Sequence, residues 1–256
     1  PKPVQKPHPP LWVACSNRET IKMAARLGIG ALTFAFVDPL EARHWVDEYY
    51  SIIKSEECVP IGHHVNANIC MVTSFSLHQD RQVAIDRGLE GFEFFGYALG
   101  SLYGFGEHRP GRMNLFDEFR KIHKKRLADN PLDITQALAA ERGGIGTPED
   151  MRNHLRKFED VGVDQVTFIQ QAGMNKHEHI CESLELFASD VLPEFKAREA
   201  ERQSRKDTDL KPYIEAAMQR KQFMEMPADK DLPVYPALGR SVVAGAGDPN
   251  KAAQGS

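Results

Sequence analysis

The chain has 256 residues, of which 41% are hydrophobic and 27% charged, which is ordinary for a soluble globular protein. A formal net charge of -4 gives no reason to expect nucleic acid or an anionic membrane as the main partner. No apolar run approaches the roughly 20 residues that a membrane-spanning helix needs. The four cysteines are scattered without a CxxC pair, so we expect a reducing, cytoplasmic setting.

The first residues, PKPVQKPHPP, do not begin with Met and lack the layout of a secretory signal. Because they lead directly into an apolar segment, they suggest an internal cut in a longer chain. A processed terminus is the alternative, and the first residues alone do not choose between the two.

Short apolar runs alternate with helical patterns over the first 195 residues. The runs predict four strands, at residues 11–15, 31–37, 65–73 and 163–170. Apolar side chains three to four residues apart predict a helix after each strand, at residues 19–27, 40–55, 148–161 and 176–195. Thr147 is the expected N-cap of the third of these helices, with Pro148 at its first position.

Repeated strand–helix units build parallel sheets with right-handed crossovers. Four such units are half of a (β/α)8 barrel, which typically needs about 250 residues. The predicted fold class is therefore α/β, of the (β/α)8 TIM-barrel type. Four parallel strands alone would leave two open edges and an open apolar face, so we expect a missing half.

Two regions depart from this repeat. An insertion at about residues 79–145 contains predicted helices at 79–95 and 115–127, and between them the glycine- and aromatic-rich segment Gly96–Gly111. We expect this segment to be a loop that closes over a substrate with Tyr97, Tyr103 and Phe105, although a structural hairpin or an oligomer contact is equally compatible. Residues 196–256 are expected to be a helical extension that ends in a disordered tail.

The strongest local signal for binding is the segment from Ser16 to Thr20, where a predicted strand ends and a helix begins. The N-terminus of a helix offers unpaired N–H groups and positive potential to a phosphate. Ser16 and Glu19 also fit a capping box, and plain capping is the simpler interpretation. The two interpretations are compatible if a phosphate binds the remaining donors.

Other candidate residues carry weaker signals. His63 and His64 precede the third strand, and His177 and His179 begin the last helix. Zinc needs three or four convergent ligands, so a solvated helix start is the simpler interpretation of the second pair and no metal site is expected. Phe34 and Phe36 of the second strand are expected in the core, or as a wall for a flat aromatic cofactor.

Three stretches together resemble the bacterial luciferase-like monooxygenase family. The first is PKPVQKPHPPLWVACSNRETIKMAARLGIGALTF, the second GIGTPEDMRNHLRKFEDVGVDQVTFIQQAG, and the third HEHICESLELFASDVLPEF. They span about residues 1–195 in the family's order. The resemblance implies that the chain is the C-terminal half of a (β/α)8 barrel, from the fifth strand onward, with residues 196–256 as an extension.

The resemblance also implies a chemistry. Family members use reduced FMN, or in some branches a deazaflavin, and FMN-type members oxidise a small organic substrate with O2, drawing reduced flavin from a reductase. The FMN phosphate would contact Ser16, Asn17, Arg18 and Thr20, although Asn17 stands where the family often has a second small residue. The early strands that carry the catalytic residues are absent, so none is assigned, and a homo-oligomer is expected for the full-length protein.

Three alternatives remain open from the sequence. The first is a deazaflavin-dependent oxidoreductase on the same barrel. The second is a metal-dependent barrel hydrolase that uses His177 and His179. The third is a flavin-binding or interaction protein without catalytic activity.

Overall fold

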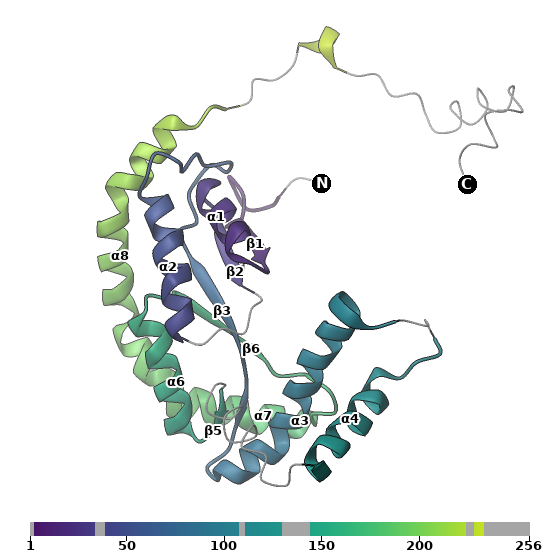
Figure 1. Ribbon diagram of the computed structural model, residues 1–256. Helices are drawn as coiled ribbons and strands as arrows, with labels where there is room; N and C mark the ends of the chain where they lie inside the picture. The colour runs from purple at the N-terminus through teal and green to yellow at the C-terminus, as the bar shows by residue number, and fades with distance from the viewer. Residues whose placement is uncertain (1–2, 34–38, 108–110, 130–143, 224–227, 233–256) are drawn as a thin grey trace, which may run out of the picture. The chain divides into compact units, whose positions relative to one another are not determined.

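The computed structural model describes residues 3–33, 39–107, 111–129, 144–223 and 228–232 (Figure 1). The chain divides into two units, Pro1–Lys221 and Gln222–Ser256. In the second unit one short 3-10 helix is described, η3 (Asp229–Asp231). Residues 233–256, for which the sequence predicts disorder, lie outside the described residues. No described helix is long and apolar enough to cross a membrane.

Four parallel strands form the main sheet of the first unit. They are β1 (Trp12–Cys15), β2 (Gly30–Thr33), β3 (Ile69–Ser74) and β6 (Gln165–Ile169). Their spatial order is β1-β2-β3-β6, and every neighbouring pair is parallel. This is the order of consecutive strand–helix units, so the predicted half of a (β/α)8 barrel is confirmed.

The third strand begins four residues later than the sequence predicts. Asn66 donates from its side chain to the carbonyl of Leu11 at 2.9 Å, and Asn68 donates to Asn66 Oδ1 at 2.6 Å. The Asn66 and Asn68 side chains therefore hold residues 65–68 as a loop that leads into β3, and these residues are not part of the strand. A second sheet of two-residue strands, β4 (Ser76–Leu77) and β5 (Ile145–Gly146), was not predicted.

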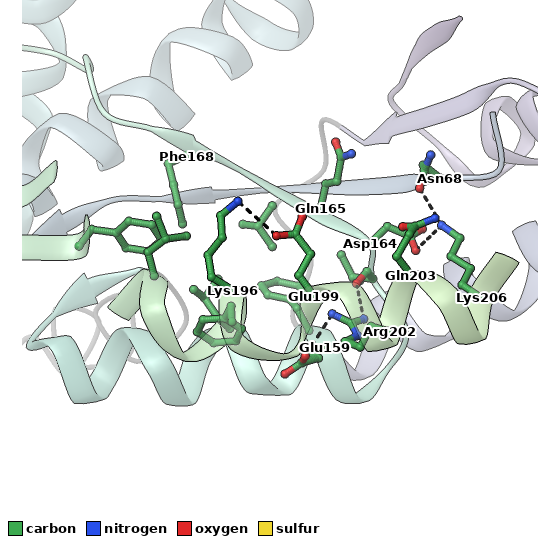
Figure 2. A pocket seen from close by; sticks show the side chains of 17 residues that line it. Asn68, Glu159, Asp164, Gln165, Phe168, Lys196, Glu199, Arg202, Gln203 and Lys206 are labelled. Atoms are coloured by element: carbon green, nitrogen blue, oxygen red, sulfur yellow. Dashed lines mark hydrogen bonds and ion pairs between the residues drawn. The ribbon is translucent and has the colours of Figure 1, made fainter. Parts of the chain in front are cut away.

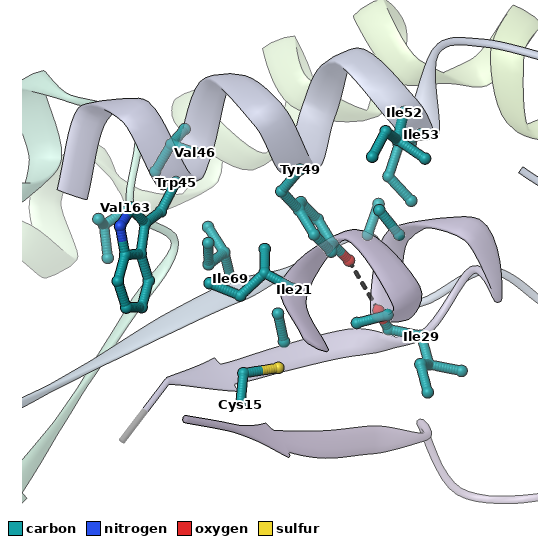
Figure 3. Close-up of a cluster of buried hydrophobic side chains, with 14 of the residues drawn as sticks. Cys15, Ile21, Ile29, Trp45, Val46, Tyr49, Ile52, Ile53, Ile69 and Val163 are labelled. Carbon is teal, nitrogen blue, oxygen red and sulfur yellow. Dashed lines mark hydrogen bonds between the residues drawn. The ribbon is translucent and has the colours of Figure 1, made fainter. Parts of the chain in front are cut away.

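Helices pack on one face of the main sheet. They are α1 (Arg18–Arg26), α2 (Pro39–Ile53) and α6 (Pro148–Asp160). Figure 3 shows Trp45, Tyr49 and Ile53 of α2 meeting Ile21 of α1 and Ile69 of β3 in the largest buried cluster. The Tyr49 hydroxyl, which is buried with its ring, donates to the carbonyls of Ile29 and Asn66, at 2.9 and 3.1 Å. Tyr49 thereby fixes helix α2 to the two loops that lead into β2 and β3.

The opposite face of the sheet, which we call the inner face, is identified by alternation along the strands. Cys15, Ile69 and Met71 belong to the helix-side core. The residues between them therefore point the other way. The inner-face residues are Trp12, Ala14, Leu32, Cys70, Val72, Ser74, Gln165, Thr167 and Ile169. Those of the central strand β3 are buried, whereas Ala14, Gln165 and Thr167 of the two edge strands are exposed.

The expected last helix is confirmed but is longer than predicted. It runs as α7 (His177–Leu186), the π-helical turn η2 (Phe187–Val191) and α8 (Leu192–Arg220). Leu210 and Ala217 of α8 are buried in the main core. The expected domain boundary near residue 195 thus falls inside a helix that belongs to the first unit.

The insertion forms a helical hairpin. Helix α3 (Arg81–Gly100) continues into the π-helical turn η1 (Ser101–Phe105), and α4 (Leu115–Asp129) follows. The expectation of a loop over Gly96–Gly111 is therefore wrong for residues 96–105, while residues 108–110 lie outside the described part. Phe94 packs on Phe116 and Phe119 of α4, with ring centroids 5.0 and 5.6 Å apart. This packing outweighs the cost of about 1 kcal/mol for each helical glycine.

Candidate functional site

The carboxyl ends of the parallel strands define one edge of the sheet, and in barrels this edge carries the chemistry. Ser16 and Asn17 follow β1 there, Phe75 follows β3, and Gln170 follows β6. Residues 34–38, which follow β2, lie outside the described part of the chain, and with them Phe34 and Phe36.

Asn17 is the N-cap of α1. Its Oδ1 accepts from the Thr20 amide at 3.0 Å and from the Thr20 hydroxyl at 3.1 Å. The expected capping box between Ser16 and Glu19 is therefore wrong. Asn caps a helix as well as Ser does, and here the helix begins one residue later than that box requires. Ser16 is exposed, and its Oγ lies 3.5 Å from Asn17 Nδ2.

Arg18 points from α1 towards α2. Its guanidinium donates to both carboxylate oxygens of Glu48, at 3.0 and 2.6 Å. This bond, more than the charge of Arg18 or Lys22, holds the pKa of Glu48 below its ordinary value against the opposing effect of burial. Lys22 lies 2.8 Å from Glu19 and 3.8 Å from Glu48. The Arg18 guanidinium is thus held by Glu48 and does not point towards Ser16.

The four residues predicted to hold a phosphate are neighbours, but their donors are not equally free. The donors of Thr20 are used by Asn17, and the guanidinium of Arg18 is used by Glu48. Within the described residues, the backbone amides of Arg18 and Glu19 have no acceptor. The Ser16 hydroxyl, which accepts from Asn17 Nδ2 at 3.5 Å, and the second hydrogen of the Asn17 side-chain amide add two further donors beside these backbone amides. Such a set at a helix N-terminus fits an anion.

Ser74, at the end of β3, was not predicted as a site residue. It is 1% exposed, and its hydroxyl has no hydrogen-bond partner among the described residues. Thr73 contacts His154 of α6 at 3.0 Å, so Ser74 lies on the inner face. On the same face Cys70 Sγ lies 3.2 Å from Thr167 Oγ1. The sequence shows a hydroxyl residue in the otherwise apolar strand ICMVTS. It does not show whether that hydroxyl has a hydrogen-bond partner.

The tyrosines of the expected lid lie in continuous helix, Tyr97 in α3 and Tyr103 in η1, and their side chains have different surroundings. Tyr97 packs on Phe119 of α4, with ring centroids 5.7 Å apart. Tyr103 is 87% exposed. The side chain of Phe105 is outside the described part. The two described tyrosines therefore do not converge, and their contact with a substrate stays a prediction.

The histidine pairs serve local structure. His177 Nε2 lies 3.5 Å from Cys181 Sγ, one turn further along α7. His8 accepts from the backbone amide of His63 at 2.8 Å and stacks on His64. Across the described ranges, no three His, Cys, Asp or Glu side chains are grouped so that they could hold a metal ion.

A groove of about 380 Å³ lies between β6, α6 and α8 (Figure 2). Its apolar wall includes Phe158, Phe168, Phe187 and Phe195. The rim is charged, and its cations are paired: Lys196 with Glu199 at 3.2 Å, Arg202 with Glu159 at 3.1 Å, and Lys206 with Asp164 at 2.6 Å. Because each cation has a carboxylate partner, this groove does not offer a phosphate site. The groove lies along β6, which is an edge strand of the main sheet.

Comparison with known proteins gives one family and one fold. The family model described as luciferase-like monooxygenase matches residues 1–165. Monooxygenase RslO1 from Streptomyces bottropensis has a similar structure, with a TM-score of 0.50 and 18% identity over 75% of this chain and 50% of that chain. No curated protein matches the chain.

Two further solved structures resemble the chain more weakly. Coenzyme F420-dependent tetrahydromethanopterin reductase from Methanopyrus kandleri has a TM-score of 0.43 and 18% identity over 73% of this chain and 51% of that chain. DmoA from Hyphomicrobium sulfonivorans has a TM-score of 0.43 and 15% identity over 76% of this chain and 44% of that chain. The chain thus spans about half the length of the solved structures that it resembles.

Proposed function

The chain belongs to the luciferase-like monooxygenase family, and on this premise we propose that it forms the phosphate-binding half of an oxidoreductase that uses reduced FMN and O2 on a small organic substrate. The observation that carries the proposal is the donor set at the start of α1. It lies at the carboxyl edge of the sheet, and it contains two backbone amides without an acceptor in the described part of the chain.

The residues fit the phosphate of FMN in a specific way. Ser16 and Asn17 would donate from their side chains, and Arg18 and Glu19 from their backbone amides. Thr20 would act through Asn17, whose orientation it fixes with two hydrogen bonds. The Arg18 side chain would contribute only its distant charge, since Glu48 holds it.

Flavin, when bound, would supply the electrons that reduce O2. The work left to this chain would be to orient the cofactor and to exclude water. The buried hydroxyl of Ser74 lies on the inner face, where a ring system inside a barrel would be held, and it has a donor to offer. The substrate, the reductase that supplies reduced flavin and the cytoplasmic location belong to the proposal as well.

The test compares FMN with riboflavin, which lacks the phosphate. We expect the chain to bind FMN at least about tenfold more tightly, a difference of about 1.4 kcal/mol, as measured by quenching of flavin fluorescence. Ser16→Asp places a negative charge beside the donor set. It should weaken FMN binding by about tenfold or more and leave riboflavin binding unchanged.

Ser204→Asp is the matched control, because it adds the same charge at an exposed position of α8. It should bind both flavins as the unchanged chain does. Equal affinity for FMN and riboflavin, or an FMN affinity that Ser16→Asp does not alter, would refute the phosphate site. Titration with the deazaflavin cofactor, whose spectrum differs from that of FMN, decides between the two branches of the family.

A further inference from the structure

Residues 3–10, which we call the strap, lead into β1 and lie against the loop of residues 59–64, which runs from α2 towards β3. His8 makes the contact between them, because its Nε2 accepts from the backbone amide of His63 at 2.8 Å. A side chain at Gly62 would meet the His8 ring at 3.0 Å, so this glycine permits the close approach. The strap is therefore attached to the loop through a histidine ring.

The partners of His8 determine which of its ring nitrogens carries the hydrogen. The carbonyl of Pro9 lies 2.7 Å from Nδ1 and can only accept, so Nδ1 carries the hydrogen. The amide of His63 can only donate, so Nε2 is the nitrogen without one. A protonated imidazole has an N–H at both nitrogens. The hydrogen bond to His63 therefore exists only while the His8 ring is neutral.

The rings beside His8 oppose a positive charge on it. The His8 ring stacks on that of His64, with centroids 4.5 Å apart, and its centroid lies 5.7 Å from that of His63. Burial lowers the pKa of His64, and the charges of His8 and His63 lower it further. A proton on His8 would thus meet two groups that are either neutral or positive.

Charged side chains also flank this contact. Lys6 belongs to the strap, and Lys221, the residue after α8, donates to two carbonyls of the 59–64 loop at 3.0 and 2.9 Å. Glu57, the carboxylate nearest to that loop in the sequence, is paired with Arg26 at 2.9 Å. Neither lysine can compensate a charge on His8, and the carboxylate is already engaged.

We propose that His8 is a pH-sensitive latch, which holds the strap on the 59–64 loop while its ring is neutral and releases the strap when the ring takes up a proton. β1 stays in the sheet, because the carbonyl of Leu11 accepts from the Gly30 amide and from the Asn66 side chain, both at 2.9 Å, and neither donor titrates. The latch lies at the amino end of β1, separate from the donor set at its carboxyl end. It controls how the chain enters the sheet.

Hydrogen exchange of the His63 amide, measured by NMR in the 256-residue chain, reports on the latch. Each rate is compared with that of an unstructured peptide at the same pH, which gives a protection factor. In the released strap the ring should titrate at the ordinary value for histidine, about pH 6.5. Protection should therefore fall about tenfold from about pH 7.5 to about pH 5.5. The Gly30 and Ile69 amides should stay far better protected at both values, since the sheet remains folded.

Three variants assign the change to His8. His8→Gln keeps an acceptor that does not titrate, so the protection of the His63 amide should no longer depend on pH. His44→Gln is the matched control, because it removes an exposed histidine of α2, and it should keep the tenfold fall. His154→Gln removes the buried histidine of α6 and should keep the fall as well, which separates the latch from opening of the whole unit.

Three results would overturn the proposal. The first is a protection factor of the His63 amide that stays the same between the two pH values in the unchanged chain. The second is a fall that persists in His8→Gln, and the third is a fall that disappears in His154→Gln. None of these measurements involves flavin, so a failure of the proposed function leaves the latch standing, and the reverse holds too.

Discussion

Asp164 joins three parts of the fold through one carboxylate. Its Oδ2 accepts from the Tyr50 hydroxyl at 2.6 Å and from the Ile69 amide at 2.8 Å, and its Oδ1 accepts from Lys206 at 2.6 Å. The side chains of Lys206 and Asp164 are only 19% and 12% exposed. Helices α2 and α8 and the start of β3 therefore depend on one acidic group at the beginning of β6.

Asp164→Ala should lower the free energy of unfolding by about 3–5 kcal/mol, because it removes the carboxylate partner of a mostly buried ammonium, which keeps only the Asn68 side-chain oxygen, and the acceptor of the Ile69 amide. Chemical denaturation with a fluorescence readout measures the change. Asp209→Ala is the matched control: Asp209 pairs with Lys54 on α2 but is 59% exposed. Its loss should cost less than about 1 kcal/mol. Equal losses in the two variants would contradict the role given to burial.

Helices α1 and α6 begin at residues whose side chains cap them, but the two sequence predictions of these caps had different outcomes. Thr147 caps α6 as predicted: its Oγ1 accepts from the Asp150 amide at 3.3 Å, and Pro148 takes the first position. The Asp150 carboxylate accepts in return from the Thr147 amide at 2.9 Å. Helix α1 is capped by Asn17 rather than Ser16, because three polar residues in a row offer more than one possible start. Sequence alone ranks these starts poorly.

Asn17→Ala should destabilise the protein by about 1 kcal/mol, since it removes the acceptor of the Thr20 amide. Ser16→Ala should change stability by less than about 0.5 kcal/mol, because the Ser16 hydroxyl caps no amide in the described structure. Thermal unfolding of the two variants, measured side by side without ligand, makes the comparison. A larger loss for Ser16→Ala would restore the capping box that the sequence suggested.

The hairpin shows where element prediction from sequence fails. Glycines at 96, 100 and 104 argue for a loop by propensity, yet α3 and η1 pass through all three. Gly91 lies inside the helix that the sequence predicts at residues 79–95. A side chain at Gly91 would collide with the Ala172 carbonyl and with Asn175, so this glycine serves close packing of the helix. Contacts of this kind come from residues about 80 positions away, and no local window contains them.

At the scale of the whole molecule, the repeat of apolar strands and amphipathic helices was enough to predict half a barrel. In the longer strands and helices apolar side chains recur at regular spacing, and this spacing is enough to predict them. The two-residue strands β4 and β5 have no periodicity to detect, and they were missed. The four residues predicted to hold a phosphate lie together at the start of α1, and their role stays a prediction. The pairing of Arg18 with Glu48 depends on the packing of α1 against α2, which the local sequence does not reveal.

His154 makes the stability of the whole unit depend on pH. Its ring, 5% exposed, lies between Thr73 of β3 and Phe158 of α6. Burial, with a smaller effect of the Lys157 charge, lowers the pKa of His154 from 6.5 to about 4. Between these values the unfolded chain binds a proton that the folded chain does not. The stability that neutral His154 allows is therefore complete above about pH 6.5 and is lost as the pH falls towards 4.

His154→Gln removes this titration while keeping a side-chain amide in reach of Thr73. The free energy of unfolding of the unchanged chain should fall by on the order of 3 kcal/mol more than that of the variant between pH 7 and pH 4. Urea denaturation at a series of pH values gives both curves. His44→Gln, which removes an exposed histidine of α2, should follow the unchanged chain. If the difference between the two curves did not vary with pH, the pKa of His154 would be the same in the folded and unfolded chain, so the buried ring would take up its proton without a cost in stability. The contact between α6 and the central strand would then need a different electrostatic explanation.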